Sequence, residues 1–417
     1  MRVVIEPSTI KGSIRAPRSK SHAIRLIMSS LIAPTEIYDL PLSDDVQAAL
    51  RAAKALGTVV EIAGDRVRLI PRERRPERTS LNAGGSATVL RFAIALAATL
   101  GIEFELDGDE TLRRRPLNAI YEALKVRGVQ MTSSRLPLKI SGKLPDAYIE
   151  IRGSESSQYV SGFMLAFCLQ GEGKISIVPP LVSKSYIYMT AEVLKLYGCS
   201  TSINETEIRV VRESAPKTVV ERVWGDHALA SFYAASALAT GGSLTISDLP
   251  QPRDYPGDHS IVEIYRRIGA VSEYIDGVWR VEAREPYSPI EVDFEDFPDL
   301  PLAVAPLTAL AEGCSKLSGV SRLRIKESDR IEAIVDTLGS FGIDVVYSNN
   351  SLTICGSKNR LRSQVSVNSL GDHRVAMMAT VLALKVGGVI EEAECVNKSN
   401  PAFWEDLTKV GGRIRIE

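Results

Sequence analysis

The strongest constraint on the fold is an order of elements that repeats along the chain. A polar turn opens an alanine-rich helix, and a short β-branched strand, a second helix and a pair of strands follow. In the first cycle we expect helices at 20–32 and 45–56 and strands at 36–40, 59–63 and 67–70. Similar cycles open near Ser86, Ser157, His227, Leu300 and His373. About six units of roughly 70 residues therefore account for the chain, which predicts a repetitive α/β protein.

Glycine recurs once in each cycle, where a helix is expected to end and a left-handed residue is favoured. These glycines are Gly57, Gly128, Gly198, Gly269, Gly342 and Gly411. The most apolar stretches, 92–100 and 375–384, are too short to span a bilayer, so they are predicted to be buried helices. The amino-terminal residues 1–6 are typical of a strand and not of a signal peptide.

Charge and cysteine content limit the possible functions. The net charge of −1 argues against a general nucleic-acid or membrane binder, which would need a broad basic surface. The five cysteines are scattered and never spaced as CxxC. This pattern predicts a reduced, cytoplasmic protein with neither a disulfide framework nor a zinc site. We expect no metal and no cofactor.

Polar motifs stand where helices are expected to begin. They are Ser19-Lys20-Ser21, Gly84-Gly85-Ser86, Ser156-Ser157-Gln158, Gly225-Asp226-His227 and Gly371-Asp372-His373-Arg374. The amino end of a helix offers unpaired N–H groups and a partial positive charge, which together bind anions. Serine and aspartate there are also ordinary N-caps. The nucleotide-binding patterns GxGxxG and GxxxxGKS or GxxxxGKT are absent from the sequence.

Two segments combine cations with small hydroxyl groups in one turn. They are 20–25, with Lys20, Ser21 and Arg25, and 326–330, which also carries an acidic side chain between its cations. Such clusters suit a substrate with phosphate and carboxylate groups beside a proton-transfer group. Each segment alone is more typical of a solvated helix face.

Taken together and in order, these motifs resemble the 5-enolpyruvylshikimate 3-phosphate synthase family of enolpyruvyl transferases. The resemblance runs nearly end to end. It rests on Lys20-Ser21 with Arg25, Leu81–Arg91, Arg115-Pro116, Ser156-Ser157-Gln158, Ser183–Tyr186, Gly225-Asp226, Pro298-Asp299, Lys326–Arg330, Asp372-His373-Arg374 and Lys398–Pro401.

The family implies a two-domain inside-out α/β barrel, with about three βαβαββ repeats in each domain and an open cleft between the domains. Carried over to this chain, residues 19–224 would form an inserted domain. Residues 1–18 and 225–417 would form the other, discontinuous domain. A monomer that closes around its ligands is expected.

The reaction implied is transfer of the enolpyruvyl group of phosphoenolpyruvate to the 5-hydroxyl of shikimate 3-phosphate. No nucleic acid or membrane takes part. By the family's motifs, shikimate 3-phosphate would be held by Lys20, Ser21, Arg25, Ser156, Ser157, Gln158, Ser183, Tyr186, Asp299, Arg322 and Lys326. Phosphoenolpyruvate would be held by Lys20, Ala87, Arg115, Gln158, Arg330, Arg374 and Lys398. Arginine suits this task because its planar fork matches carboxylate and phosphate oxygens.

Three residues are candidates for proton transfer. The family implies that Asp299 is the base on the 5-hydroxyl and that Glu327 is a general acid or base; Lys20 is the third candidate. From the residues alone, Asp299 is as readily the cap of an apolar helix. The i,i+3 spacing of Glu327 and Arg330 is also that of a surface ion pair on a helical turn.

The sequence departs from the family at three positions. Arg322 stands where many members have asparagine beside the shikimate phosphate, and an added cation there is chemically reasonable. His227 follows Asp226 where a smaller residue is more usual, and it suggests no function. Ala87 occupies a position that is glycine in glyphosate-sensitive members, which leads us to expect reduced sensitivity to glyphosate.

Rival functions are also compatible with parts of the sequence. UDP-N-acetylglucosamine enolpyruvyl transferases share the chemistry, but they usually carry a cysteine on the loop before the Arg-Pro motif, and residues 108–114 have none. A non-catalytic sensor of phosphate ligands would not need Lys20, Asp299 and Glu327 together. RNA binding through the arginines of 72–78 lacks interleaved aromatic residues.

Overall fold

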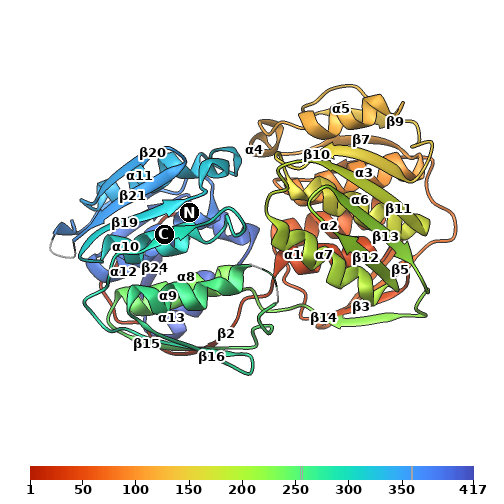
Figure 1. The fold of residues 1–417 in the computed structure, drawn as a ribbon. Helices are drawn as coiled ribbons and strands as arrows, with labels where there is room; N and C mark the ends of the chain where they lie inside the picture. Colours follow the sequence, from red (N-terminus) through yellow and green to blue (C-terminus); the bar gives the residue numbers. More distant parts are fainter. Residues whose placement is uncertain (254, 256, 358–359) are drawn as a thin grey trace. The chain divides into compact units, whose positions relative to one another are not determined.

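The computed structural model describes residues 1–253, 255, 257–357 and 360–417. The chain divides into two compact units (Figure 1). Unit 1 comprises Met1–Pro17 and Trp224–Glu417, and unit 2 comprises Arg18–Val223. Both units are mixtures of helices and short mixed sheets, which confirms the predicted α/β class. The inside-out barrel remains a prediction.

Unit 2 contains three four-stranded sheets, in the orders β14-β3-β5-β4, β6-β7-β9-β8 and β10-β11-β13-β12. The strands are β3 (Thr35–Tyr38), β4 (Thr58–Ala63), β5 (Arg66–Pro71), β6 (Arg78–Asn82), β7 (Glu103–Asp107), β8 (Gln130–Met131), β9 (Leu138–Ser141), β10 (Tyr148–Arg152), β11 (Glu172–Val178), β12 (Cys199–Ile203), β13 (Glu207–Arg212) and β14 (Val219–Arg222).

Unit 1 contains three more, in the orders β22-β23-β1-β24, β16-β17-β15-β2 and β18-β19-β21-β20. The strands are β1 (Val3–Glu6), β2 (Lys11–Arg15), β15 (Ser243–Ser247), β16 (Val271–Ile275), β17 (Val278–Glu282), β18 (Glu291–Asp293), β19 (Gly313–Ser318), β20 (Asp344–Ser348), β21 (Ser351–Gly356), β22 (Val365–Asn368), β23 (Gly388–Glu391) and β24 (Arg413–Ile416).

All six sheets share one pairing pattern. Each has one parallel pair of strands at one edge, such as β6 with β7, and two antiparallel pairings across the rest. The predicted sixfold repetition is therefore confirmed at the level of topology. All six glycines predicted at helix ends have positive φ angles, between 74° at Gly198 and 105° at Gly411.

Three helices in each unit are buried and pack against one another. In unit 2 they are α1 (Lys20–Ser29), α3 (Ala87–Leu100) and α6 (Ser157–Gln170); in unit 1 they are α8 (His227–Ala239), α10 (Pro301–Ala309) and α12 (His373–Val386). Helices that are apolar all round belong in a core. The predicted buried helices at 92–100 and 375–384 are confirmed as parts of α3 and α12.

The remaining helices are shorter or amphipathic. They are α2 (Asp44–Ala55), α4 (Glu110–Arg113), α5 (Asn118–Val126), α7 (Lys184–Leu196), α9 (Ile261–Ile268), α11 (Arg330–Ser340) and α13 (Phe403–Lys409), with 3₁₀ turns η1 (Asp258–Ser260), η2 (Ser321–Ile325) and η4 (Ala393–Lys398). Among the described residues, no helix combines the length and the apolar character needed to cross a membrane.

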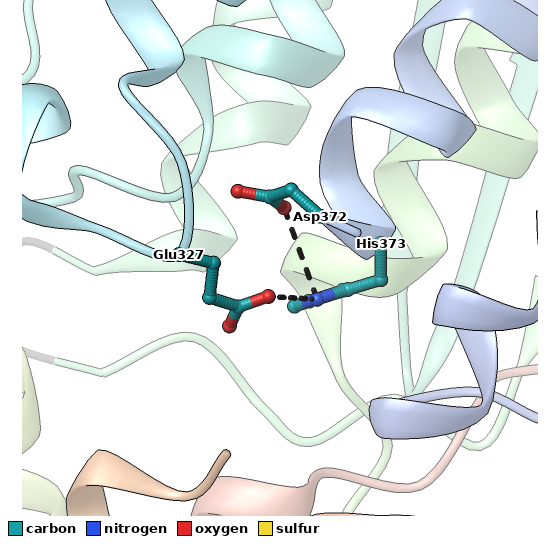
Figure 2. A group of neighbouring side chains, drawn as sticks. All are labelled: Glu327, Asp372 and His373. Atoms are coloured by element: carbon teal, nitrogen blue, oxygen red, sulfur yellow. Dashed lines mark hydrogen bonds and ion pairs between the residues drawn. The ribbon is translucent and has the colours of Figure 1, made fainter. Parts of the chain in front are cut away.

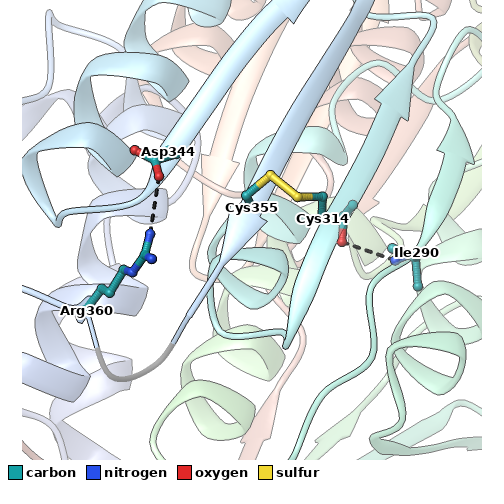
Figure 3. The surroundings of a disulfide bond; sticks show 6 residues. Ile290, Cys314, Asp344, Cys355 and Arg360 are labelled. Carbon is teal, nitrogen blue, oxygen red and sulfur yellow. Dashed lines mark hydrogen bonds and ion pairs between the residues drawn. A yellow bond between two sulfur atoms is a disulfide. The ribbon is translucent and has the colours of Figure 1, made fainter.

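The prediction that the cysteines form no disulfides is wrong. Cys168 of α6 is bonded to Cys199 of β12, and Cys314 of β19 is bonded to Cys355 of β21 (Figure 3). The partners are 31 and 41 residues apart in sequence. Spacing along the chain does not reveal such pairs, because the fold brings their elements together. The cysteine pattern therefore no longer supports a reduced compartment.

We expect thiol counting to detect both bonds. Cys395 is the one free cysteine in the structure, so denatured protein should show one reactive thiol without reductant and five after reduction. The double variant Cys314→Ser/Cys355→Ser should lower the free energy of unfolding by about 2–4 kcal/mol under non-reducing conditions. Cys395→Ser is the matched control. The difference in unfolding free energy between this variant and the wild type should be the same with and without reductant. Five reactive thiols without reductant would contradict the bonding.

Candidate active site

The predicted polar motifs lie at the amino ends of the buried helices. Several act as N-caps: the Ser156 side chain accepts from the Gln158 N–H, and Asp226 from the Leu229 N–H. Asp372 accepts from the Arg374 N–H at 2.9 Å. Capping satisfies some backbone donors, and the other N–H groups of these first turns keep the partial positive charge that attracts anions.

In unit 1, charged side chains and one histidine, from four segments, form one group, which we call the unit 1 cluster. Its members are Asp299, Lys326, Glu327, Arg330, Asp372, His373, Arg374 and Lys398. The cluster joins the residue two positions before α10 and residues just before or in the first turns of α11 and α12 with the end of η4. Sequence separation within it reaches roughly 100 residues, so only the fold brings these charges together.

Asp299 lies among cations and does not cap a helix. The N-cap of α10 is Leu300, which makes no side-chain capping bond. The Asp299 carboxylate instead lies 3.1 Å from Nη1 of Arg330, 3.4 Å from Nζ of Lys326 and 3.4 Å from Nη2 of Arg374. The capping interpretation of Asp299 is therefore not supported. A carboxylate held this way is fixed in position and stays close to positive charge.

Glu327 contacts a histidine and two cations. Its carboxylate lies 2.8 Å from Nδ1 of His373 (Figure 2). It also lies 3.5 Å from Nζ of Lys398 and 4.0 Å from Nη2 of Arg330. The helical turn expected around it is absent, because α11 begins only at Arg330, after the N-cap Asp329. The contact with Arg330 therefore forms from an irregular loop.

Arg330 and Asp372 form the buried base of the cluster. Two guanidinium nitrogens of Arg330 donate to the two oxygens of Asp372, at 2.8 and 3.1 Å. Arg330 is 2% exposed and Asp372 is 0% exposed. Burial is the largest single influence and acts to raise the pKa of Asp372, but the charge and hydrogen bonds of Arg330, together with the charge of His373, lower the pKa on balance. Both groups are therefore charged.

Two further groups have shifted pKa values. Burial lowers the pKa of Lys326 to about 8, although the charge of Asp299 acts in the opposite direction. Burial, with the charges of Asp299 and Asp226, raises the pKa of Asp258 to about 7. Asp258 was not singled out from the sequence, and only its proximity to Asp299 in the fold draws attention to it.

The carboxylates and histidine of the cluster resemble a metal site in geometry alone. One ligand atom from each of Glu327, Asp372 and His373 lies within 4.8 Å of the others (Figure 2). However, Arg330 already donates to both oxygens of Asp372, and Lys398 lies beside Glu327. A divalent cation would lie against these two positive groups, so we interpret the trio as part of an ion-pair network.

Unit 2 holds the other predicted site residues. Lys20, at the start of α1, is ion-paired with Asp45 of α2 at 2.8 Å. Asp45 was missed from the sequence, because nothing in its local pattern distinguishes it from an ordinary first-turn acid of a helix. The pair is largely shielded from solvent, which fixes the position of the Lys20 amino group.

Arg25 is held entirely inside unit 2. It is 1% exposed and donates to Oγ1 of Thr190 at 2.8 Å and to the carbonyl oxygens of Ser21 and Tyr186 at 2.8 and 3.0 Å. These bonds use all three guanidinium nitrogens. They fix α1 against α7, and a ligand role for Arg25 stays a prediction.

The other predicted residues of unit 2 lie at or near helix starts. Ser156 and Gln158 both accept from Arg91 of α3, and Gln158 also donates to Thr88. Ser183 precedes α7 with a φ of 50°, and Ala87 is the buried first residue of α3. The full group in this unit is Lys20, Ser21, Arg25, Ala87, Arg115, Ser156, Ser157, Gln158, Ser183 and Tyr186, whereas the unit 1 group is Asp299, Arg322, Lys326, Glu327, Arg330, Arg374 and Lys398.

His227, which suggested no role in the sequence, should make stability depend on pH. It is 6% exposed, and burial, then the charges of His259 and Arg253, lower its pKa to about 3. Below its usual pKa of about 6.5 the unfolded chain binds a proton that the folded protein excludes. The His227 contribution to stability is therefore complete above pH 6.5 and is lost as the pH falls toward 3.

Denaturant unfolding of the wild type and of His227→Phe between pH 7.5 and 4.5 would measure this contribution. The wild type should lose up to about 1.4 kcal/mol per pH unit more than the variant. Parallel pH curves for the two proteins would contradict the assignment.

Comparison with known proteins identifies relatives along the whole chain. Residues 4–407 match the family model described as EPSP synthase (3-phosphoshikimate 1-carboxyvinyltransferase). The chain is 46% identical to a 3-phosphoshikimate 1-carboxyvinyltransferase of Saccharolobus islandicus and 47% identical to one of Saccharolobus solfataricus, with 100% of each chain covered. One from Caldivirga maquilingensis is 41% identical, again over 100% of both chains.

Solved structures of more distant proteins have the same fold. An EPSP synthase from Acinetobacter baumannii superposes with a TM-score of 0.79 at 23% identity, over 100% of both chains. The enolpyruvyl transferase NikO from Streptomyces tendae superposes with a TM-score of 0.75 at 16% identity, over 99% of this chain and 98% of that one. These likenesses support the two-domain α/β fold.

Proposed function

Because the chain belongs to the EPSP synthase family, the 3-phosphoshikimate 1-carboxyvinyltransferases, we propose that its two groups of polar residues together perform that family's reaction. The protein is a transferase of the shikimate pathway, which leads to chorismate and the aromatic amino acids. It moves the enolpyruvyl group of phosphoenolpyruvate to the 5-hydroxyl of shikimate 3-phosphate and releases phosphate. The observation that supports our residue assignment best is the unit 1 cluster, where two carboxylates are held among cations at the ends of three helices.

We propose that shikimate 3-phosphate is bound by hydroxyl groups and cations. Hydrogen bonds to charged groups contribute about 1.5–3 kcal/mol each, so several are needed to offset the desolvation of a dianionic phosphate. The residues are Lys20, Ser21, Arg25, Ser156, Ser157, Gln158, Ser183, Tyr186, Asp299, Arg322 and Lys326. The pKa of Lys326, near 8, means that this contribution weakens in alkaline solution.

Phosphoenolpyruvate is proposed to meet mainly arginine and lysine side chains, whose charges match its carboxylate and phosphate. The residues are Lys20, Ala87, Arg115, Gln158, Arg330, Arg374 and Lys398. Arg330 and Arg374 both contact Asp299, so a substrate bound there would lie beside a carboxylate.

Proton transfer is assigned to Asp299, Glu327 and Lys20. Asp299 would accept the proton of the attacking hydroxyl, and the cations around it would stabilise the charge of the substrate oxygen as it develops. Glu327 and Lys20 are the candidates for moving a proton to and from the methylene carbon. Asp45 would keep the Lys20 amino group in place.

The test is phosphate release from phosphoenolpyruvate by the purified protein with shikimate 3-phosphate as acceptor. UDP-N-acetylglucosamine serves as the control acceptor, since it is the substrate of the rival transferases. Phosphate release with shikimate 3-phosphate but not with UDP-N-acetylglucosamine supports the proposed reaction. Turnover only with the sugar nucleotide, or with neither acceptor, would contradict it.

Ala87 should reduce binding of glyphosate. It begins α3 and is 6% exposed, so its methyl group narrows the space that glycine would leave. One methyl group in a tight pocket is worth roughly 10-fold or more in discrimination. Ala87→Gly should lower the inhibition constant of glyphosate by about that factor, with a smaller effect on the KM for phosphoenolpyruvate. Micromolar competitive inhibition of the wild-type protein would contradict this prediction.

We further propose a monomer in the cytoplasm, with residues 19–224 and residues 1–18 plus 225–417 as its two functional domains. Light scattering during size-exclusion chromatography tests whether the protein is a monomer. A mass near 45.4 kDa supports a monomer. A mass of twice that value would show a dimer and contradict the proposal of a monomer.

A further inference from the structure

A chain of buried and half-buried side chains in unit 2 connects Gln158, a proposed substrate ligand, with the segment that carries a second one, Arg115. Its members are Arg91 of α3, Tyr159 of α6 and Glu155, which precedes α6. None of them was assigned a role from the sequence, and none is among the proposed substrate ligands. All of the contacts described below lie within unit 2.

At one end, Arg91 fixes the orientation of Gln158. Nη1 of Arg91 donates to Oε1 of Gln158 at 2.6 Å and to Oγ of Ser156 at 3.1 Å. The Gln158 amide nitrogen then donates to Oγ1 of Thr88 at 2.8 Å. With its oxygen and one N–H engaged, the Gln158 amide has a single defined orientation, and its second N–H points in a fixed direction.

In the middle, Arg91 stacks on a tyrosine that is bonded to a carboxylate. The Arg91 guanidinium lies 5.0 Å from the centre of the Tyr159 ring, a cation–π contact. The Tyr159 hydroxyl donates to Oε1 of Glu155 at 2.5 Å. Burial raises the pKa of Tyr159, and the charge of Arg91 offsets this only in part, so the hydroxyl remains a donor over the whole working range of pH.

At the other end, the same groups hold the segment that carries Arg115. Oε2 of Glu155 accepts from the N–H of Ala119, in the first turn of α5, at 2.9 Å. The Tyr159 hydroxyl also lies 3.4 Å from the carbonyl oxygen of Pro116. The hydroxyl proton goes to Glu155, so the approach to Pro116 is a packing contact, and the hydrogen bond that holds this backbone lies four residues after Arg115, at Ala119. An acid at the start of α5 is also favoured by the helix dipole.

On the basis of the reaction proposed above, on which this inference rests, we propose that Arg91, Tyr159 and Glu155 are positioning residues for phosphoenolpyruvate. They hold Gln158 and the Arg115 segment in fixed places relative to each other, so that both ligands meet the substrate without further ordering. Pre-organisation of this kind lowers the cost of binding. Gln158 is proposed to bind both substrates, whereas Arg115 is proposed to bind phosphoenolpyruvate alone. Loss of the Tyr159–Glu155 contact, which lies at the Arg115 end, should therefore raise the KM for phosphoenolpyruvate more than the KM for shikimate 3-phosphate.

The decisive variant is Tyr159→Phe, which removes the hydroxyl and keeps the ring under Arg91. We expect the KM for phosphoenolpyruvate to rise roughly 10-fold, the size of one charge-assisted hydrogen bond at the lower end of its range. The KM for shikimate 3-phosphate should change less than about twofold, within the range of an indirect effect. The KM of Glu155→Gln for phosphoenolpyruvate should lie between those of the wild type and of Tyr159→Phe. The reason is that glutamine has one carbonyl oxygen, which can accept from either Tyr159 or Ala119.

Tyr197→Phe is the matched control. Tyr197 is also a fully buried tyrosine of unit 2, and its hydroxyl is bonded to Leu26 and Thr35, neither of which is in the proposed site. This variant should lower the melting temperature and leave both KM values unchanged. A merely structural role for Tyr159 would give the same result for Tyr159→Phe, and that outcome would overturn the proposal.

A double-variant cycle tests the route of the effect. In an Arg115→Ala background, Tyr159→Phe should change the KM for phosphoenolpyruvate much less than in the wild type, because the ligand that it positions is gone. Additive effects would overturn the proposal. If the wild-type protein itself releases no phosphate with shikimate 3-phosphate, the proposed function fails first; an active wild type with an unchanged Tyr159→Phe variant contradicts the positioning role alone.

Discussion

Asp299→Asn and Glu327→Gln should each lower kcat by at least roughly 100-fold, the usual contribution of a general acid or base. Asparagine preserves the shape of Asp299, and its carbonyl oxygen can still accept from Lys326 and Arg330. Its amide group cannot take up a proton from the substrate hydroxyl. Glutamine likewise keeps the size of Glu327 beside His373 and Lys398. Initial rates of phosphate release would measure both effects.

Circular dichroism and melting curves must accompany these rates, because each substitution removes a negative charge from among cations. Asp344→Asn is the matched control: Asp344 is a carboxylate of unit 1 that pairs with Arg360 at the surface, 77% exposed (Figure 3). It should keep full activity. Folded Asp299→Asn and Glu327→Gln proteins with near-wild-type kcat would remove both residues from the mechanism.

The two substitutions should differ in their pattern of loss. If Asp299 acts on the attacking hydroxyl and Glu327 on the methylene carbon, a solvent deuterium label should enter the methylene group of phosphoenolpyruvate in Asp299→Asn protein, though slowly, and not in Glu327→Gln protein. Exchange at equal rates in both variants would show that Lys20 moves that proton instead.

Much of the fold could be predicted from the sequence because it depends on local signals. Each of these signals involves only a few neighbouring residues: a glycine at a helix end, an apolar helix or a polar helix start. Together they predicted the repeats and the position of each buried helix. The loop at Lys326–Asp329 was mistaken for a helical turn, because i,i+3 charge spacing does not distinguish a helix from a tight loop.

The partners of the site residues could not be predicted, because they depend on contacts across the fold. Asp45 and Lys20 are 25 residues apart, and Arg91 and Gln158 are 67 apart. The disulfides were missed for the same reason. Asp258 also has no local signature, since the pKa of its carboxyl group is raised by burial and by the charges of Asp299 and Asp226, which are distant in the sequence.

Asp372→Asn should be the most destabilising single change in the unit 1 cluster, lowering the free energy of unfolding by about 3–5 kcal/mol. The reason is that Arg330, 2% exposed, would lose the charge of the carboxylate that binds two of its nitrogens. Asparagine retains an oxygen that can cap α12, so loss of the cap does not confuse the result. Urea unfolding at pH 7, above the lowered pKa of Asp372, measures the effect.

The double variant Arg330→Met/Asp372→Asn separates the cost of an unpaired charge from the loss of a favourable contact. Removing the cation as well leaves no buried charge without a partner in that pair, and methionine fills most of the space of the arginine stem. Because a buried ion pair is worth little compared with an uncharged replacement, the second substitution should restore a large part of the stability that the first removed. If Asp372→Asn alone lies within about 1 kcal/mol of the wild type, the pair is no more than a surface-like contact, and the cations of the cluster are balanced by Asp299 and Glu327 instead.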